Sequence, residues 1–316
     1  MKILIIGGGS VGLGIASCLI KSGNNVSIAA RKEACEKLRS VGLLRSGVFG
    51  EYRANPELFK PYSAVSDIPK DKYDYILVCT KSFDTRQVAE ELKSENRLVS
   101  NETGIVLFQN GYGNFEIFSE FFPREQVYIA RVITGFRLIE KNHVDITVHA
   151  APILIGSILP FYSENMADLC KSISKGDIPA EVSQEINKVL WSKILYNSML
   201  NPLGAIFGVP YGAIGESQHG RTMMDSIAGE IFEVMEASGC STHWPTAAAF
   251  LEEFYTNMLP PTISHESSML QSIRINRPTE IDALNGAIIE LGRKNNVPTP
   301  VNLMVTNLIK FLEYKD

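Results

Sequence analysis

The sequence of 316 residues has few cysteines, and they are scattered without a CxxC pair. They are Cys18, Cys35, Cys79, Cys170 and Cys240. This usage is typical of a reducing compartment, where cysteine serves as a small buried apolar residue. The sequence therefore predicts a cytoplasmic protein without disulfide bonds. The five histidines show no HxxxH spacing, so no metal site is expected.

Long apolar runs and basic clusters are also missing. The apolar run 3–6 is too short for a signal-peptide core, and no later stretch approaches the roughly 20 apolar residues of a membrane span. The formal net charge is −5, and no basic run is longer than the pair Arg31-Lys32. Because nucleic-acid binding needs a concentrated basic face, neither nucleic acid nor a membrane is expected as a partner.

The first part of the chain alternates strand and helix patterns. An apolar run at 2–6 predicts a buried parallel strand, helical spacing predicts a helix over 11–22, and 26–30 is the next expected strand. Together they form a βαβ unit of about 30 residues. Further elements are expected at 75–79 (strand), 84–95 (helix) and 104–108 (strand). This alternation predicts a parallel, doubly wound sheet.

From residue 127 onward, strand-like segments follow one another without a helix between them. They span 127–134, 144–148 and 153–155, and we expect them to finish the sheet as antiparallel or edge strands. A helix near 163–174 and a short strand near 179–183 complete a first domain of residues 1–183.

Residues 184–316 predict an all-α second domain, because the strand pattern almost vanishes and Gly, Pro and Asn separate helical segments. The expected helices span 184–200, 219–238, 245–258, 263–274, 278–294 and 300–314. The fold class is therefore α/β, an N-terminal Rossmann-like doubly wound sheet followed by an all-α C-terminal domain. Apolar residues on the C-terminal helices suit either a core or a homodimer interface, and the sequence leaves both open.

A glycine motif, Gly7-x-Gly9-x-x-Gly12, separates the first strand from the first helix. Gly7 permits a tight turn, Gly9 lets the backbone approach a pyrophosphate, and Gly12 lets the helix lie close to the sheet. The helix N-terminus offers N–H groups to phosphates. The motif predicts a dinucleotide-binding loop made of Gly7, Gly8, Gly9, Ser10, Val11 and Gly12. The alternative is a glycine-rich structural turn.

The end of the second strand indicates which dinucleotide is bound. NAD enzymes usually place an acidic residue there for the ribose 2′-OH, whereas a guanidinium binds a 2′-phosphate. This strand ends in Ala29-Ala30-Arg31-Lys32. Arg31 therefore favours NADP(H) as the cofactor. The alternative is a solvated turn, since Glu33 follows directly.

One predicted helix carries a polar stripe. Lys193, Asn197 and Asn201 recur every fourth residue among apolar side chains, which places them on one helix face. Asparagine is a poor helix former with no reason to recur on a solvated face. The stripe predicts a polar site lining a cleft, and contact with another polar helix is the alternative.

A second polar cluster begins at Ser267-Ser268-Met269 and continues through Arg274 to Arg277-Pro278-Thr279-Glu280-Ile281-Asp282 and Asn285-Gly286. Thr279 is a candidate cap for the helix that follows, with Glu280 and Asp282 in its first turn. This structural role is the alternative to a functional one for both carboxylates, and we favour it for Asp282.

These motifs together resemble the ketopantoate reductase (2-dehydropantoate 2-reductase) family over essentially the whole chain. The matching landmarks are the glycine loop, Arg31, Lys81, Phe108-Gln109-Asn110-Gly111, Lys193-x-x-x-Asn197-x-x-x-Asn201-Pro202, Ser267-Ser268-Met269, Thr279-Glu280-Ile281-Asp282 and Asn285-Gly286. The resemblance implies NADPH-dependent reduction of 2-dehydropantoate to pantoate, a step of pantothenate biosynthesis on the way to coenzyme A.

The resemblance also implies roles for individual residues. Lys193 would be the general acid, Asn197 and Asn201 would hold the substrate, and Ser268 would bind its carboxylate. The residue chemistry agrees, because reduction of a 2-oxo acid delivers a hydride to carbon and a proton to the developing alkoxide. An ammonium group stabilises that negative charge and supplies the proton.

On the cofactor side, the resemblance implies that Asn110 contacts both cofactor and substrate. Glu280 would lie between the nicotinamide ribose and the reacting oxygen, and Lys81 would lie near the cofactor. Hydride transfer would require the groups of the two predicted domains to converge on one substrate.

Two positions depart from the family pattern. Tyr211 stands where the family often has asparagine, and Arg131 lies in a segment where small residues are more usual. Both are expected to shape the substrate pocket.

Two other hypotheses therefore remain: the same reaction on a different 2-oxo acid, and a catalytically silent dinucleotide-binding module. The intact Lys193 and Glu280 argue against a silent module, because a pure binder needs no proton donor.

Overall fold

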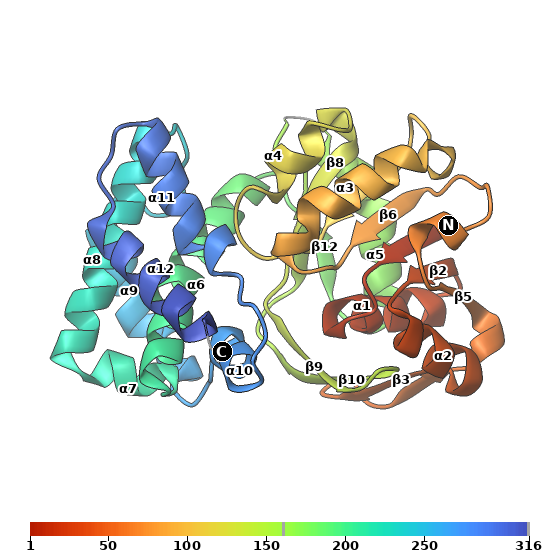
Figure 1. The fold of residues 1–316 in the computed structure, drawn as a ribbon, viewed down its shortest axis with the longest axis horizontal. Coiled ribbons are helices and arrows are strands. Elements are labelled where there is room, and N and C mark those ends of the chain that lie inside the picture. Colours follow the sequence, from red (N-terminus) through yellow and green to blue (C-terminus); the bar gives the residue numbers. More distant parts are fainter. Residues whose placement is uncertain (160–161, 315–316) are drawn as a thin grey trace. The chain divides into compact units, whose positions relative to one another are not determined.

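The computed structural model describes residues 1–159 and 162–314 (Figure 1). The chain forms two compact units, the first made of residues 1–109 and 114–186 and the second of 110–113 and 187–316. The chain therefore passes to the helical unit after Ile186, whereas the sequence placed the boundary after residue 183. The loop Asn110–Gly113 belongs with the helical unit although it lies within the first half of the sequence.

Over the described residues, the first unit contains an eight-stranded sheet with the order β12-β11-β8-β7-β6-β1-β2-β5. Its strands are β1 (Lys2–Ile6), β2 (Asn25–Ala29), β5 (Phe59–Tyr62), β6 (Tyr75–Val78), β7 (Gly104–Leu107), β8 (Val127–Arg131), β11 (Ile153–Gly156) and β12 (Ala180–Val182). Neighbouring strands are parallel except for β8 and β11. The strand order reverses between β1 and β6, so the predicted doubly wound sheet is confirmed.

The helices of this unit connect the strands. They are α1 (Ser10–Lys21), α2 (Lys32–Val41), α3 (Thr85–Ser94), α4 (Asn114–Ser119) and α5 (Ala167–Lys175). The glycine loop leads directly into α1, as the sequence predicted.

A second, smaller sheet corrects one expectation. It has the order β4-β3-β10-β9 and consists of β3 (Leu43–Gly47), β4 (Tyr52–Ala54), β9 (Thr134–Glu140) and β10 (His143–His149). The prediction that the strands after 127 finish the main sheet was therefore wrong for β10, and β9 was not predicted as a separate strand. The chain leaves the main sheet after Arg131, and β10 pairs with β3, about a hundred residues earlier.

A buried arginine joins the small sheet to the helices. Arg45 on β3 is 2% exposed; its guanidinium donates to the carbonyl of Gly176 at 2.9 Å and forms an ion pair with Asp177. Lys21 at the end of α1 lies 2.7 Å from the same carboxylate. Burial alone would raise the pKa of Asp177, but the hydrogen bonds from Lys21 and Arg45 outweigh it and lower that pKa.

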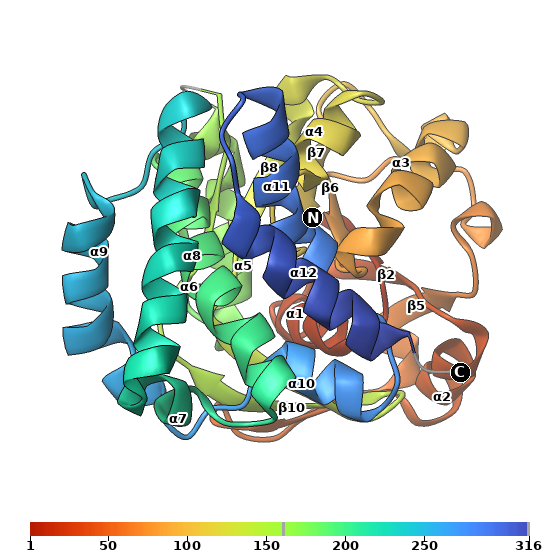
Figure 2. The ribbon, with the colours of Figure 1, turned by 60° about the vertical axis from the view of Figure 1, so that its left-hand side comes forward.

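The second unit is helical throughout its described residues. Its helices are α6 (Ile186–Phe207), α7 (Tyr211–Glu216), α8 (Gln218–Ala237), α9 (Ala247–Glu253), α10 (Ser268–Arg274), α11 (Asn285–Lys294) and α12 (Pro300–Glu313) (Figure 2). The all-α prediction is confirmed, although α7 was not predicted and several bounds were wrong. Helix α6 continues past residue 200, α10 starts at Ser268 rather than 263, and α11 starts at Asn285 rather than 278.

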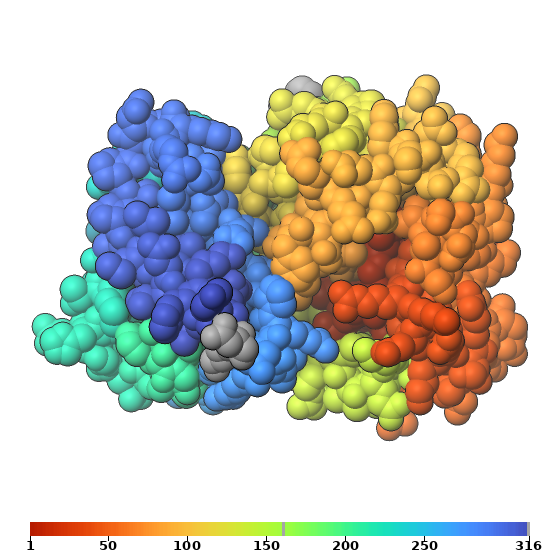
Figure 3. All heavy atoms as spheres, in the orientation of Figure 1, coloured from red at the N-terminus to blue at the C-terminus, as the bar shows by residue number. Residues whose placement is uncertain are grey.

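Helix α12 has apolar side chains on both of its faces. Val305 and Ile309 are buried, whereas Leu303, Met304, Leu308 and Phe311 are 41–74% exposed. Figure 3 shows the atoms of α12, in dark blue, on the visible surface. Among the described residues, no helix is long and apolar enough to cross a membrane.

A proline inside α6 explains a buried asparagine. Pro202 has no N–H, so the carbonyl of Ser198 loses its usual helical donor. The side chain of Asn285 donates to that carbonyl at 3.1 Å. Asn285 is fully buried and also donates to Asn302, which in turn bonds the carboxylate of Glu230. The Asn201-Pro202 and Asn285-Gly286 segments are thus connected, because Asn285 replaces the hydrogen bond that Pro202 removes from α6.

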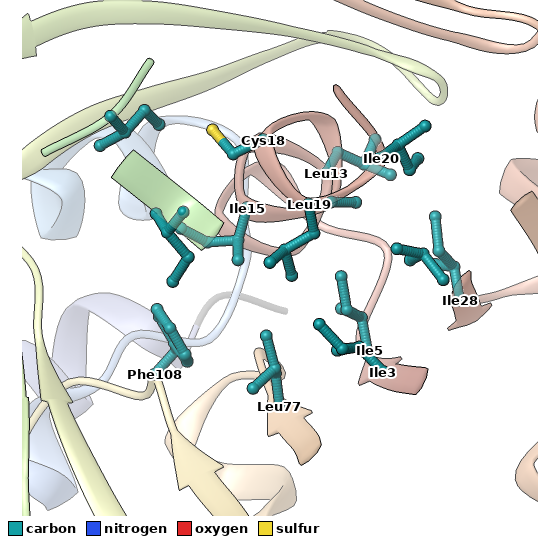
Figure 4. Packing of buried hydrophobic residues seen from close by; sticks show 14 of the residues in the cluster. Ile3, Ile5, Leu13, Ile15, Cys18, Leu19, Ile20, Ile28, Leu77 and Phe108 are labelled. Atoms are coloured by element: carbon teal, nitrogen blue, oxygen red, sulfur yellow. The ribbon is translucent and has the colours of Figure 1, made fainter. Parts of the chain in front are cut away.

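Helix α1 is buried along most of its length, because it contacts both sheets of the first unit. Ile3, Ile5 and Ile28 of the main sheet lie opposite Leu13 and Leu19 of α1 (Figure 4). On the small-sheet side, a Cβ added at Gly14 would lie 2.3 Å from the ring of Phe136. A helix that is apolar on all sides is expected in such a buried position. The packing fixes the N-terminus of α1 beside the carboxyl ends of the strands.

Candidate active site

The glycine loop has the geometry of a phosphate cradle. Gly7 has φ +114°, and an added Cβ would lie 2.8 Å from the backbone of Cys79. A Cβ at Gly12 would lie 1.9 Å from the carbonyl oxygen of Gly7, so α1 can start this close to the loop only with glycine. At Gly9, by contrast, nothing lies within 4 Å of the position of an added Cβ. This open space leaves the first N–H groups of α1 accessible, which fits a pyrophosphate there.

The first turn of α1 supports an anion in this place. It contains Ser10 and Val11 and no acidic residue, and Gly9 is its N-cap without a side-chain hydrogen bond. The backbone N–H groups at a helix start have no partner within the helix and carry a partial positive charge. The loop residues therefore fit the phosphates of a dinucleotide.

Arg31 follows the end of β2 by two residues. It is exposed and forms the N-cap position of α2, so its guanidinium is available to a ligand. Asp84 lies within electrostatic reach: burial raises the pKa of this carboxyl group, and Arg31 opposes the rise. Lys81, also exposed, follows β6 at the same edge of the sheet.

The loop Asn110–Gly113 places Asn110 in the helical unit, although this residue belongs to the first half of the sequence. Gly111 has φ +86°, and a Cβ there would lie 2.3 Å from the carbonyl oxygen of Ala283. The N–H of Tyr112 donates to that same oxygen at 2.8 Å, and its ring lies 5.3 Å from the ring of Trp191 on α6. These contacts hold Asn110 between α6 and the turn at 281–283.

Asn110 joins the two residues that were expected to carry the chemistry. Its Oδ1 accepts a 2.6 Å hydrogen bond from Nζ of Lys193, and its Nδ2 donates to Oε2 of Glu280 at 3.2 Å. Because the lysine is a donor and the carboxylate an acceptor, both contacts fix the orientation of the Asn110 amide. The sequence placed each residue near the reaction but did not predict that this amide links them.

Lys193, Asn197 and Asn201 all lie within α6, where their spacing of four residues places them along one helix face. Asn197 is partly buried, and Asn201 is 6% exposed. The hydroxyl of Tyr211 donates to Oδ1 of Asn201 at 2.6 Å. This bond leaves the Nδ2 donors of Asn201 for another acceptor. Tyr211, which departs from the family pattern, therefore acts directly on a predicted substrate-binding side chain.

The two adjacent serines, Ser267 and Ser268, lie in different environments. Ser267 is buried and caps α10: its hydroxyl accepts from the N–H of Leu270 and lies 3.2 Å from the carbonyl of Asn201. Ser268 is exposed at the first position of α10.

The predicted capping role of Thr279 was wrong. Its hydroxyl accepts from the N–H of Ile281 in a short 3₁₀ turn, Ile281–Ala283, and α11 begins only at Asn285. Glu280 consequently lies outside the first turn of α11. Asp282 lies in the 3₁₀ turn and forms an ion pair with Lys310 of α12, so its role is structural although it is not a helix cap.

The arrangement can transfer a proton without a metal ion. Over the described residues, no three His, Cys, Asp or Glu side chains gather as metal ligands. Lys193 offers an ammonium group, Asn110 orients it, and Glu280 supplies negative charge through the same amide. An ammonium group held in this way can act as a general acid toward an alkoxide.

Two family models match the chain. "Ketopantoate reductase PanE/ApbA" matches residues 3–159, and "Ketopantoate reductase PanE/ApbA C terminal" matches residues 185–313. Among curated proteins, 2-dehydropantoate 2-reductase of Aquifex aeolicus is 34% identical over 99% of this chain and 97% of its own length. The uncharacterized oxidoreductase YkpB of Bacillus subtilis is 27% identical over 95% of each chain.

Solved structures share the fold. A D-mandelate dehydrogenase in a ternary structure with NADH and anilino(oxo)acetate has a TM-score of 0.88 and 25% identity, covering 99% of this chain and 98% of its own. A PanE/ApbA family ketopantoate reductase from Ralstonia eutropha has a TM-score of 0.84 and 24% identity, with the same coverage. Similarity thus extends over both units of the chain.

Proposed function

Because this chain belongs to the ketopantoate reductase PanE/ApbA family, we propose that it reduces 2-dehydropantoate to pantoate with NADPH. The observation that carries the proposal is the amide of Asn110, which is hydrogen-bonded to both Lys193 and Glu280. The reaction would serve pantothenate biosynthesis. A reductase of this kind needs a positioned proton donor, and these three residues supply one.

Lys193 is the proton donor in this proposal. When the reduced nicotinamide is bound, it supplies the hydride for the carbonyl carbon of the substrate. The carbonyl oxygen gains negative charge, and the Lys193 ammonium stabilises it and gives up one proton. The products are the secondary alcohol, the oxidised cofactor and a neutral lysine, which regains its proton from solvent.

The cofactor residues in this proposal are the glycine loop, Arg31, Lys81, Asn110 and Glu280. The open space at Gly9 and the N–H groups of α1 suit the pyrophosphate. Arg31 suits a 2′-phosphate, because a guanidinium binds phosphate through two parallel hydrogen bonds. These features favour NADPH over NADH.

The substrate residues are Asn110, Lys193, Asn197, Asn201 and Ser268. Asn201 is the best defined, because Tyr211 occupies its Oδ1 and leaves its Nδ2 to donate to a substrate oxygen. Asn197 makes no hydrogen bond to any described residue and is partly buried, which suits a ligand contact.

Product analysis tests the proposal. The purified chain is mixed with NADPH and 2-dehydropantoate, and both NADPH consumption and pantoate formation are followed. We expect one pantoate for each NADPH oxidised. Consumption of NADPH without pantoate, or no consumption at all, would contradict the assigned reaction.

A second candidate is the same reaction on a different 2-oxo acid. The similarity to a D-mandelate dehydrogenase whose structure holds NADH and anilino(oxo)acetate favours it. The departures at Tyr211 and Arg131 also fall on positions expected to shape the pocket. Phenylglyoxylate, the 2-oxo acid that corresponds to mandelate, is the substrate that separates the two candidates.

For assembly and location we propose a cytoplasmic homodimer. The exposed stripe of α12 (Leu303, Met304, Leu308 and Phe311) is an apolar surface suited to a partner copy. All five cysteines are free, as expected in a reducing compartment. Light scattering of the wild type and of Phe311→Glu tests the dimer: a monomeric wild type contradicts it, and a monomeric variant supports this face.

A further inference from the structure

A second arginine of the first unit lies at the ligand-binding edge of the main sheet. Arg131 is the last residue of β8, which runs parallel to β7, β6 and β1. Its neighbours at that edge are therefore the glycine loop after β1, Lys81 after β6 and Gln109 after β7. In open α/β sheets ligands bind outside the carboxyl ends of the strands. Arg131 is placed to meet one.

Its guanidinium makes no hydrogen bond or ion pair with the part of the chain that the structure describes. Nη1 is buried, yet it makes no hydrogen bond to any described residue. No carboxylate of the described residues forms an ion pair with it, and burial lowers the pKa of Arg131. Arg131 is only partly buried as a residue, but a buried donor without an acceptor is costly, so such atoms normally have a partner or bind a ligand.

Gln109 supplies a second unpartnered atom at the same edge of the sheet. Leu107 and Ile129 are register partners at the end of β7; Gln109 follows two residues beyond that end, and Arg131 is the last residue of β8, so both lie at the same edge of the sheet. The neighbouring residues Phe108 and Ala130 belong to the buried core. Nε2 of Gln109 donates to the carbonyl of Lys81, which leaves Oε1 buried and without a donor. Neither this oxygen nor Nη1 of Arg131 has a hydrogen-bond partner among the described residues, so both atoms are left for a ligand.

The position of β8 identifies the kind of anion. β8 is three strands from β1, about 14 Å at the usual strand spacing, and four strands from β2. The glycine loop, where the cofactor pyrophosphate would bind, and Arg31, where the 2′-phosphate would bind, are therefore at least this far from β8. The remaining anion of the reaction is the carboxylate of the substrate, which a guanidinium binds through two parallel hydrogen bonds.

We propose that Arg131 binds the carboxylate of the 2-oxo acid and so makes the enzyme selective for acids. The inference rests on the proposed function, because it needs a 2-oxo acid as substrate. Ser268, which the family resemblance links to the carboxylate, is a neutral and exposed donor. A charged group contributes more to the discrimination between an acid and a neutral ketone.

The test uses Arg131→Met, which keeps the length of the side chain and removes its charge. We expect the KM for 2-dehydropantoate to rise on the order of 10- to 100-fold, with kcat changed less than about threefold. The dissociation constant of NADPH, measured by fluorescence titration, should stay within about twofold. Arg131→Lys should recover part of the loss, because it restores the charge without the bidentate fork. Arg137→Met is the matched variant, since Arg137 is exposed and pairs with Asp145 on β10; it should change none of these values.

Thermal unfolding separates a ligand-binding arginine from a structural one. Without ligand, Arg131→Met should unfold at the same temperature as the wild type or higher, because it removes an uncompensated buried charge. Pantoate with NADP⁺ should stabilise the wild type more than the variant. A lower melting temperature without ligand would overturn the inference, as would an unchanged KM or a loss confined to NADPH binding. If the wild type does not reduce 2-dehydropantoate, the proposed function fails instead, and the same variants are then tested on the 2-oxo acid that it does reduce.

Discussion

The ammonium group of Lys193 donates a 2.6 Å hydrogen bond to Oδ1 of Asn110, a residue 83 positions earlier in the chain. Asn110 also donates to Glu280, so one amide fixes the acid and the carboxylate relative to each other. This arrangement explains why the loop Asn110–Gly113 belongs with the helical unit. Its glycine at 111 permits the close approach to Ala283 that puts the amide in place.

Removal of the proton donor should affect turnover more than binding. We expect Lys193→Ala to lower kcat by about 10²- to 10⁴-fold, which is the usual contribution of a positioned general acid, while NADPH binding is retained. Steady-state kinetics and a fluorescence titration of NADPH measure the two effects. Lys188→Ala on the same helix is the matched variant and should turn over normally. Near-normal kcat in Lys193→Ala would show that Lys193 is not the acid.

The cofactor preference should depend on Arg31. NADPH should be preferred over NADH on the order of 10- to 100-fold, since one charge-assisted phosphate contact separates them. Arg31→Ala should remove most of this preference and leave NADH use nearly unchanged. The ratio of kcat/KM for the two cofactors measures it, with Arg39→Ala of α2 as the matched variant. A wild type that prefers NADH would contradict the assignment.

Tyr211 should act through Asn201. Tyr211→Phe removes the donor to Oδ1, so the amide of Asn201 can rotate and present the wrong atom to the substrate. We expect the KM for the 2-oxo acid to rise about 5- to 10-fold, the cost of about one hydrogen bond. Tyr196→Phe removes a hydroxyl that bonds Thr262 in the same aromatic cluster and should leave KM unchanged. Equal effects of the two variants would indicate a packing role for Tyr211.

Asp177 should make stability depend on acid pH. The pKa of Asp177 is lowered in the folded protein. Its contribution to the free energy of unfolding is therefore complete above the unfolded-state pKa of about 3.9, and it is lost as the pH falls through the folded-state pKa. Asp177→Asn leaves Arg45 buried without a full counter-charge and should cost about 3 kcal/mol at neutral pH. Urea unfolding at pH 7 and near pH 3 should show this difference shrinking at the lower pH. A constant difference would show that charge is not the cause.

The elements with a clear hydrophobic period could be predicted from the sequence. The strand at 2–6, helix α1 and the polar stripe of α6 all follow from local spacing, and their site residues could be named. The small sheet could not be predicted, because β3 and β4 are short and β3 pairs with β10, about a hundred residues away. Local periodicity carries no information on such pairing.

The errors around residue 280 have a different cause. Thr279 followed by two carboxylates has the composition of a helix start, yet here the same residues form a single 3₁₀ turn that contacts Tyr112. The Asn110 link and the Tyr211–Asn201 bond were also beyond the sequence, since each depends on tertiary contact. A buried asparagine such as Asn285 had one available signal, the helix-breaking Pro202, whose freed carbonyl needs a donor.

The most direct test of the central claim is a side-by-side measurement of kcat/KM for 2-dehydropantoate and phenylglyoxylate with saturating NADPH. A 2-dehydropantoate reductase should favour its own substrate by at least about tenfold, which corresponds to about 1.4 kcal/mol of transition-state binding. Lys193→Ala should lower both values together, because the acid serves either substrate. A wild type that favours phenylglyoxylate by the same margin would contradict the assigned substrate and identify the chain as a reductase of another 2-oxo acid.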